Sequence, residues 1–234
     1  MRQKIKQILK GTANHIFGDF KKNIPSVPER LLDNAIKNSC KYAEEHMQDA
    51  MMFFNQEDLR NYSITLLKQS LITDRYYLEF GVYKGKSINL FSSKLPEITF
   101  EGFDSFEGLQ EDWRGWALPK GTFDLKGVLP KVNNNVNLHK GWFNKTLPGF
   151  LKENKHDKIR FIHIDCDTYE STKYLFDTLG DKMDSNTYIL FDEYLGYRGW
   201  EIGEYKGFQE FVKQNNITYQ YLGFSNYNTL VKLL

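Results

Sequence analysis

The spacing of hydrophobic residues changes near residue 75. Before that point apolar positions recur at helical spacing and runs of β-branched residues are absent, which is typical of amphipathic helices. Pro25 and Pro28 interrupt this region once. We expect the clearest helix from Arg30 to Met52 and a shorter one around residues 56–69. The pattern therefore predicts an N-terminal helical extension over residues 1–75.

From Tyr76 onward, short apolar segments alternate with helical segments, which indicates a mostly parallel sheet with helices on both faces. The last two apolar segments, 218–223 and 229–233, predict an antiparallel hairpin. Class I methyltransferases end their sheet in this way, whereas dinucleotide dehydrogenases continue in parallel. We therefore predict a Rossmann-like α/β domain over residues 76–234. Its other strands are expected at 76–80, 99–103, 136–139, 161–165 and 188–191, and its helices at 86–93, 144–154, 169–179 and 205–214.

Charge gives the chain little general attraction for nucleic acid, because 31 basic residues nearly balance 30 acidic ones. A basic run stands at the N-terminus. We interpret it as a solvated helical face in preference to a membrane-binding or partner-binding arm. Its members are Arg2, Lys4, Lys6, Lys10, Lys21 and Lys22.

Two cysteines cannot form a disulfide framework, and the sequence contains no secretory segment and no apolar run of about 18 residues. These features predict a cytoplasmic protein without a transmembrane segment. We assign Cys40 to helix packing and Cys166 to a small position beside more reactive residues. The helices of the extension are expected to cover the cleft or to join subunits into a homo-oligomer.

A glycine-containing turn follows the first predicted strand, at Leu78–Ser87. Gly81 and Gly85 allow a sharp turn on which a ligand can lie, and the helix after them offers free N–H groups. Their spacing departs from the three-glycine fingerprint of NAD-binding folds. Glu79, at the end of the strand, suits a ligand with an amino group, which S-adenosylmethionine (SAM) has and NAD lacks.

Asp104 ends the second predicted strand. In doubly wound folds a carboxylate at this position accepts hydrogen bonds from both ribose hydroxyls of a nucleotide. The alternative is that Asp104 caps the loop together with Ser105. The combination of Glu79 and Asp104 favours a nucleotide-like cofactor.

Four acidic residues follow two further strands: Asp165 and Asp167 after one, Asp192 and Glu193 after the next. The ends of neighbouring parallel strands lie about 5 Å apart, so the four carboxylates should converge on one cleft. A hard divalent cation such as Mg²⁺ would offset their repulsion. The alternative for Asp167 is a helix cap. His163 is expected to be a satisfied interior residue, whereas His139 ends a strand and is expected to face the cleft.

Five ordered motifs resemble the macrocin O-methyltransferase family, whose members methylate sugar hydroxyls. They are Leu-Glu-Phe-Gly-Val-Tyr-Lys-Gly-Lys-Ser (78–87), Phe-Asp-Ser-Phe-Glu-Gly-Leu (103–109), Gly-Trp-Phe-Asn-Lys-Thr-Leu-Pro (141–148), Ile-Asp-Cys-Asp-Thr-Tyr-Glu-Ser-Thr (164–172) and Phe-Asp-Glu-Tyr (191–194). The resemblance covers roughly residues 76–215. It implies SAM as methyl donor, Mg²⁺ held after the fourth and fifth strands, and a sugar hydroxyl of a small molecule as acceptor.

The resemblance carries site residues over to these motifs. The implied metal ligands are Asp165 or Asp167 with Asp192 and Glu193; Glu193 stands where the family usually has aspartate, and Cys166 where it has glycine. In the related catechol type a lysine base occupies the position of Thr168, so Asp167 or His139 is the expected base. The expected cofactor contacts are Glu79, Gly81, Tyr83, Gly85, Ser87, Asp104, Ser105, Phe106, Gly141, Trp142 and Asp165.

Three other functions compete with this interpretation. A metal-dependent hydrolase would use the acidic residues but would leave Glu79 and Asp104 without a role. A nicotinamide oxidoreductase conflicts with the glycine spacing. A non-catalytic protein that binds partners through its first 75 residues would not need the intact acidic set. The acceptor itself is not specified, although Tyr194, Tyr197, Trp200 and the Trp113–Trp116 segment offer aromatic rings for a sugar face or for packing.

Overall fold

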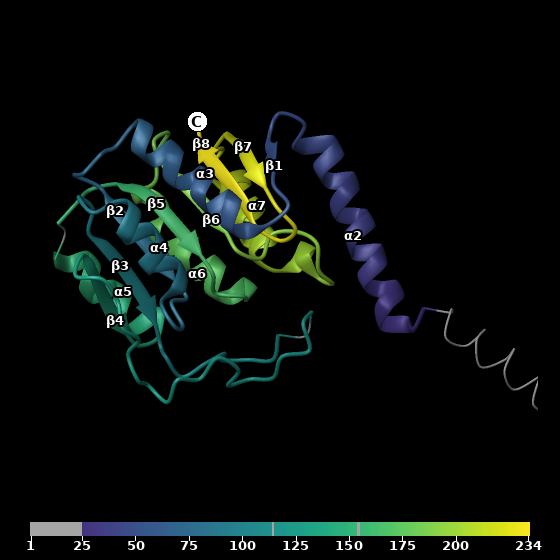
Figure 1. The fold of residues 1–234 in the computed structure, drawn as a ribbon, viewed down its shortest axis with the longest axis horizontal. Coiled ribbons are helices and arrows are strands. Elements are labelled where there is room, and N and C mark those ends of the chain that lie inside the picture. The colour runs from purple at the N-terminus through teal and green to yellow at the C-terminus, as the bar shows by residue number, and fades with distance from the viewer. Residues whose placement is uncertain (1–24, 114, 154) are drawn as a thin grey trace, which may run out of the picture.

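The computed structural model describes residues 25–113, 115–153 and 155–234. One eight-stranded sheet runs through this part of the chain, in the order β1-β7-β8-β6-β5-β2-β3-β4 (Figure 1). The strands are β1 (Met51–Met52), β2 (Tyr76–Phe80), β3 (Phe100–Asp104), β4 (Val136–Lys140), β5 (Ile159–Ile164), β6 (Tyr188–Phe191), β7 (Tyr219–Phe224) and β8 (Thr229–Leu233).

The sheet combines a parallel half with an antiparallel end. Strands β4, β3, β2, β5 and β6 are parallel, while β8 pairs antiparallel with both β6 and β7. The order reverses at β2, from which the chain leads first to β3 and β4 and later to β5 on its other side. The predicted Rossmann-like methyltransferase sheet with its C-terminal hairpin is confirmed.

Helices cover both faces of this sheet (Figure 1). Alternate residues of a strand point to opposite faces, so Leu78 of β2 packs into one hydrophobic core and Tyr77 into the other. The first core receives residues of α5 (Phe143–Glu153), α6 (Tyr169–Leu179) and α7 (Glu204–Gln214), and the second receives residues of α3 (Gln56–Gln69) and α4 (Lys86–Lys94).

Residues 1–24 of the predicted N-terminal helical extension lie outside the described residues, and its described part differs from the prediction at Met51 and Met52. Its long helix α2 (Val27–His46) begins with a capping box between Ser26 and Glu29 and ends before Met51. Met51 and Met52 form β1 instead of a helix end, and they pair in parallel with Gly223 and Phe224 at the edge of the sheet. Periodicity could not reveal a two-residue strand, because its pairing depends on a partner far along the chain.

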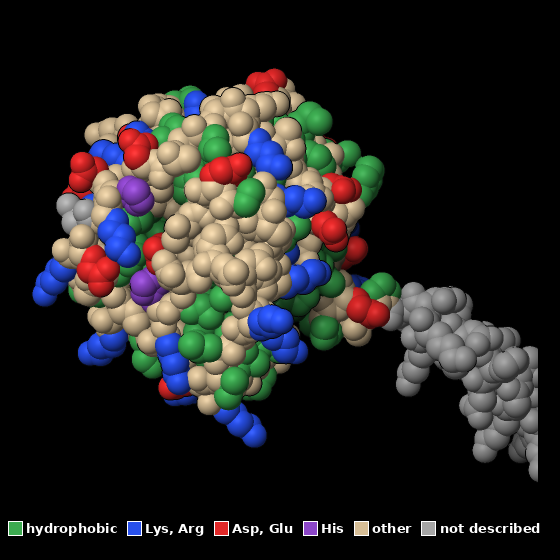
Figure 2. All heavy atoms as spheres, turned by 60° about the vertical axis from the view of Figure 1, so that its left-hand side comes forward, with side chains coloured by type: hydrophobic (Ala, Val, Ile, Leu, Met, Phe, Trp, Pro, Cys, Tyr) green, Lys and Arg blue, Asp and Glu red, His purple; other side chains and the backbone are tan. Residues whose placement is uncertain are grey.

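The surface in Figure 2 shows basic and acidic side chains interspersed, as the nearly balanced charge leads one to expect. Within the described ranges no helix is long and apolar enough to cross a membrane. Cys40 is exposed on α2, so its assignment to helix packing was wrong, whereas Cys166 is buried. The basic residues from Arg2 to Lys22 lie outside the described residues.

Candidate active site

A cleft of about 300 Å³ opens at the carboxyl ends of β2, β3, β5 and β6. This edge of a parallel sheet is where α/β folds bind ligands. All four acidic residues predicted as metal ligands line the cleft. The predicted cofactor residues that line it are Gly81, Tyr83, Asp104, Ser105, Trp142 and Asp165.

Gly81 fixes the turn after β2 against the loop after β5. Its φ is +90°, and a Cβ built on it would lie 1.6 Å from the carbonyl oxygen of Asp165. Any side chain here would displace backbone, so this position requires glycine. Gly85 has φ +76° and occupies the N-cap position of α4. The structure therefore explains both predicted glycines as turn positions, with Gly81 at the cleft wall.

Glu79 does not line the cleft. Its side chain is 1% exposed and accepts hydrogen bonds from the Ser87 hydroxyl at 2.9 Å and from Nδ1 of His163 at 2.9 Å. Glu79 and Ser87 thus belong to the interior, and the expected contact of Glu79 with a ligand amino group has no support in the structure. Of the other predicted contacts, the Phe106 ring is buried in the core, and neither Gly85 nor Gly141 is among the residues that line the cleft.

Asp104 lies at the cleft with most of its acceptor capacity in use. Oδ2 accepts from the backbone N–H groups of Val82 at 2.9 Å and Tyr83 at 2.7 Å, and Oδ1 accepts from that of Phe106 at 2.7 Å. Each carboxylate oxygen has two acceptor sites, so one site on Oδ1 remains for a ligand. The loop-cap alternative is therefore correct in part, because Asp104 holds the glycine turn in place while it lines the cleft.

His139 lies apart from the acidic residues. It is on β4 at the outer edge of the sheet, three strand spacings or roughly 14 Å from β5. Its Nε2 contacts Oε2 of Glu101 at 2.6 Å, and its ring stacks on Phe103 with centroids 4.4 Å apart. The expectation that His139 faces the cleft was wrong, because the sequence gives strand ends but not their order across the sheet.

The acidic residues come together as predicted. Single oxygens of Asp165, Asp167 and Glu193 lie within 4.8 Å of one another. Burial, and then the charge of Asp192, raises the pKa of Asp165 and of Glu193 well above the ordinary values, and the same two causes raise the pKa of Asp167 to about 8. Oε2 of Glu193 is buried and has no partner among the described residues. Among the described residues no cation lies beside Asp167 or Glu193, whereas Asp165 lies close to His163.

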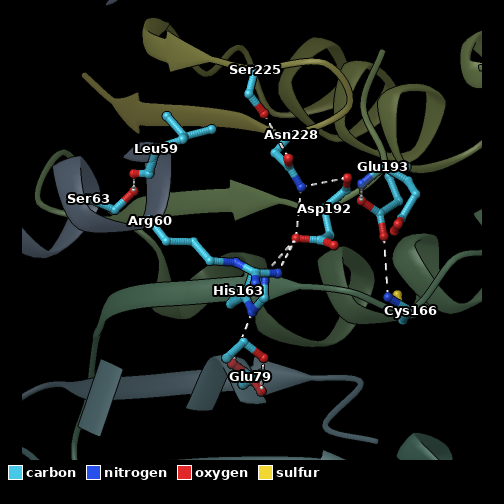
Figure 3. Close-up of polar contacts among 12 residues, drawn as sticks. Leu59, Arg60, Ser63, Glu79, His163, Cys166, Asp192, Glu193, Ser225 and Asn228 are labelled. Atoms are coloured by element: carbon cyan, nitrogen blue, oxygen red, sulfur yellow. Dashed lines mark hydrogen bonds and ion pairs between the residues drawn. The ribbon is translucent and has the colours of Figure 1, made fainter. Parts of the chain in front are cut away.

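Asp192, in contrast, is paired with cations (Figure 3). Its Oδ1 accepts from Nη2 of Arg60 at 2.7 Å and contacts Nε2 of His163 at 3.3 Å. Burial acts to raise the pKa of Asp192, but the His163 hydrogen bond and the Arg60 charge bring it below the ordinary value. Burial likewise acts to lower the pKa of His163, and its bonds to Asp192 and Glu79 raise that pKa to about 10. His163 is a satisfied interior residue, as expected, and it is cationic at neutral pH.

Two buried residues of the site were not predicted. Arg60 reaches Asp192 from α3, and a basic residue on an amphipathic helix gives no signal that it points inward. Glu204, at the first position of α7, is fully buried and accepts hydrogen bonds from the backbone N–H groups of Cys166 and Glu193. Its place beneath the acidic cluster depends on how α7 packs, which no local pattern reveals.

A second cavity of about 880 Å³ adjoins the cleft. Gln110, Trp113, Asp167 and Thr168 line both. Trp113 and Tyr197 form an aromatic wall of this second cavity, and Trp116 stacks on Tyr197 with centroids 5.9 Å apart. Tyr194 and Trp200 are buried in the core, and Tyr197, although it borders the cavity, is only 2% exposed, so these three aromatic residues serve packing.

A family model described as a methyltransferase domain matches residues 78–194, half of the chain. The chain belongs to this methyltransferase family. The match confirms the predicted enzyme class, for which SAM is the expected methyl donor. It also places Arg60 and Glu204 outside the matched region, although both reach the cluster.

Solved structures with the same fold include two methyltransferases. The O-methyltransferase NovP is 18% identical, with a TM-score of 0.55 over 75% of this chain and 78% of its own. CalS11, a calicheamicin methyltransferase, is 19% identical, with a TM-score of 0.59 over 89% of this chain and 94% of its own. A second structure of CalS11 is titled as that of a TDP-rhamnose 3'-O-methyltransferase. These similarities show the fold. No curated protein matches the chain.

Proposed function

We propose that this methyltransferase transfers the methyl group of SAM to a hydroxyl of a sugar or glycosylated small molecule, with the help of a divalent cation. The observation that carries the proposal is that one cleft joins a nucleotide-type wall, with Gly81 and Asp104, to a cluster of unneutralised carboxylates. A hydrolase needs only the cluster, and a binding protein needs neither arrangement.

The cofactor side of the cleft fits SAM in its donor groups. The turn at Gly81 offers a close backbone approach, and Asp104 keeps one acceptor site for a ribose hydroxyl. Tyr83 and Trp142 add aromatic surface for the adenine ring. We assign the cofactor to these four residues, with Ser105 beside them.

The carboxylate side fits a hard divalent cation such as Mg²⁺. Oxygen ligands are those that Mg²⁺ prefers, and the unpartnered Oε2 of Glu193 is a donor atom that no described residue satisfies. Asp165, Asp167 and Glu193 bring three carboxylates within bonding range of a single ion. When bound, the cation would lower the pKa of an acceptor hydroxyl and offset the charge of the cluster.

The acceptor would enter through the second cavity. Methyl transfer requires a hydroxyl in line with the S–CH₃ bond, so the enzyme chiefly positions its two substrates. Asp167 lies where the two cavities meet, which makes it the best placed residue to accept the hydroxyl proton. Trp113 is suited to stack on the face of a sugar ring. The sugar acceptors of relatives such as CalS11 agree with this assignment.

The proposal is tested by separating cofactor binding from transfer. Calorimetry should show SAM binding to the purified protein, and a lysate incubated with isotope-labelled SAM should yield a labelled glycoside detectable by mass spectrometry. Excess chelator should abolish transfer and leave SAM binding intact. Asp167→Asn should do the same, whereas the exposed Asp177→Asn should change neither. Full turnover in the presence of excess chelator would show that transfer needs no divalent cation. Failure to bind SAM would contradict the whole proposal.

A further inference from the structure

Arg60 is a buried cation placed against the acidic cluster from outside the matched methyltransferase domain. Its side chain is 8% exposed, and Nη2 lies 2.7 Å from Oδ1 of Asp192. Helix α3 holds it there: the helix is capped by the Asn55 side chain, and Leu59, beside Arg60, is fully buried. Figure 3 shows the guanidinium extending from α3 to Asp192, directly beside His163. A buried guanidinium in this place is a fixed positive charge within the site.

Arg60 shares its acceptor oxygen with two more donors. Oδ1 of Asp192 also accepts a hydrogen bond from Nδ2 of Asn228 at 2.8 Å and contacts Nε2 of His163 at 3.3 Å. Since a carboxylate oxygen has two acceptor sites, Oδ1 has no capacity left for a metal ion, and an ion could approach Asp192 only at Oδ2. A divalent cation bound to Asp192 would also lie close to the Arg60 charge and be repelled by it.

The side chains on this side of the cluster already contact one another. Glu79, His163, Asp192 and Arg60 form a chain in which both ring nitrogens of His163 are occupied by carboxylates. A histidine ring between two carboxylates cannot offer a nitrogen lone pair to a metal. The grouping of His163, Asp165 and Asp192 is therefore a poor cation site, although its atoms lie close together.

The other side of the cluster is different. Among the described residues the buried Oε2 of Glu193 has no hydrogen-bond partner, and single oxygens of Asp165, Asp167 and Glu193 lie within 4.8 Å of one another. We propose that Arg60 is a positioning residue, a built-in counter-ion that withdraws Asp192 from cation binding and confines a divalent ion to Asp165, Asp167 and Glu193. This inference rests on the proposed use of a cation and specifies which carboxylates hold it.

Mn²⁺ alone is a suitable probe, because its binding to the full-length protein can be measured by electron paramagnetic resonance without an acceptor. Glu193→Gln should weaken Mn²⁺ binding at least tenfold. Asp192→Asn should change it less than threefold, because Asp192 is not a ligand. Circular dichroism and SAM binding verify that each variant is folded.

Removing Arg60 should release Asp192. Arg60→Met should bind Mn²⁺ at least threefold more tightly, and Asp192→Asn placed in that background should now weaken binding at least tenfold. Arg60→Lys keeps the charge and should behave as the wild type. Lys68→Met, which removes an exposed charge from the same helix, is the matched control and should have no effect.

A measurement on the wild type covers the case in which these variants do not fold. With aspartate carboxyl carbons labelled with ¹³C, Mg²⁺ should shift the resonances of Asp165 and Asp167 and leave that of Asp192 almost unmoved. A tenfold loss of Mn²⁺ binding in folded Asp192→Asn, or a large Mg²⁺ shift at Asp192, would overturn the inference and leave the proposed function standing. A protein that binds SAM but no divalent ion would overturn both this inference and the proposed use of a divalent cation.

Discussion

Oε2 of Glu204 accepts a hydrogen bond from the backbone N–H of Glu193 at 3.2 Å, while Oε1 accepts one from Cys166 at 3.3 Å. One buried carboxyl group thus joins the segments that follow β5 and β6. Because these segments carry the acidic residues, Glu204 sets the distance between the two sides of the cluster from below.

We predict that Glu204→Gln destabilises the protein by about 1–3 kcal/mol, because the amide nitrogen cannot accept from the N–H group it would face. Urea denaturation measures this free energy of unfolding. Glu201→Gln, an exposed change one turn earlier, is the control and should be neutral within roughly 0.5 kcal/mol. Equal stabilities of the two variants would show that the hydrogen bonds of Glu204 contribute nothing.

We predict that Asp104→Asn weakens SAM binding by about 1–3 kcal/mol, or roughly 5- to 150-fold. The amide must turn its NH₂ group either toward the N–H groups of Val82 and Tyr83 or toward that of Phe106, so the turn that cradles the cofactor is disturbed in both orientations. Calorimetry gives the dissociation constant, with Asp177→Asn as control. An unchanged constant in folded Asp104→Asn would remove Asp104 from the cofactor site.

We predict that deletion of residues 1–75 yields an aggregating or inactive core. The deletion removes β1 and so exposes the edge of β7 with which β1 pairs. It also leaves the buried Asp192 without its partner Arg60. Loss of one partner of a buried ion pair costs about 3–5 kcal/mol. Size-exclusion chromatography and a SAM-binding assay measure the outcome. A truncated protein that stays monomeric, soluble and active would show that the extension is dispensable.

We predict a small acid-dependent contribution from Asp184, whose Oδ1 pairs with Nη1 of Arg75 at 2.7 Å. The hydrogen bond from Arg75 lowers the pKa of Asp184 below the usual range of an aspartate. A lowered folded-state pKa stabilises the protein above the unfolded value, and this stabilisation is lost as the pH falls through the folded value. Asp184→Asn should therefore cost roughly 0.2–1 kcal/mol at pH 7, and the difference should vanish once the pH has fallen through the lowered folded-state pKa. A cost that persists at low pH would point to packing instead of charge.

The sequence predicts the parts of the site that depend on strand order along the chain. Asp104, Asp165 and Asp192 each stand at or just after the end of an apolar strand, and parallel pairing brings such ends to one edge. Gly81 was predictable because a strand-to-helix turn has few backbone solutions. These inferences use local pattern and the general geometry of α/β folds.

The parts that escaped prediction depend on contacts between distant segments. His139 ends a strand as predicted, but β4 lies at the sheet's outer edge. Met51 and Met52 become a strand only because β7 lies beside them. Arg60 and Glu204 are charged residues on amphipathic helices, and their burial follows from packing against the cluster, which hydrophobic periodicity does not record.

The contact between Gly81 and the carbonyl of Asp165 has a consequence for the release of the spent cofactor. Asp165 also donates its N–H to the carbonyl of Phe80, so the cofactor turn and the first acidic segment share backbone on both sides. Two segments joined in this way move together and cannot part to open an exit. S-adenosylhomocysteine would have to leave past the long connection between β3 and β4, which supplies Trp113 and Phe123 to the cleft, where their rings contact Tyr197 and Tyr83. Turnover would then be governed by how fast that connection swings away from its aromatic partners, at a place remote from the methyl transfer itself.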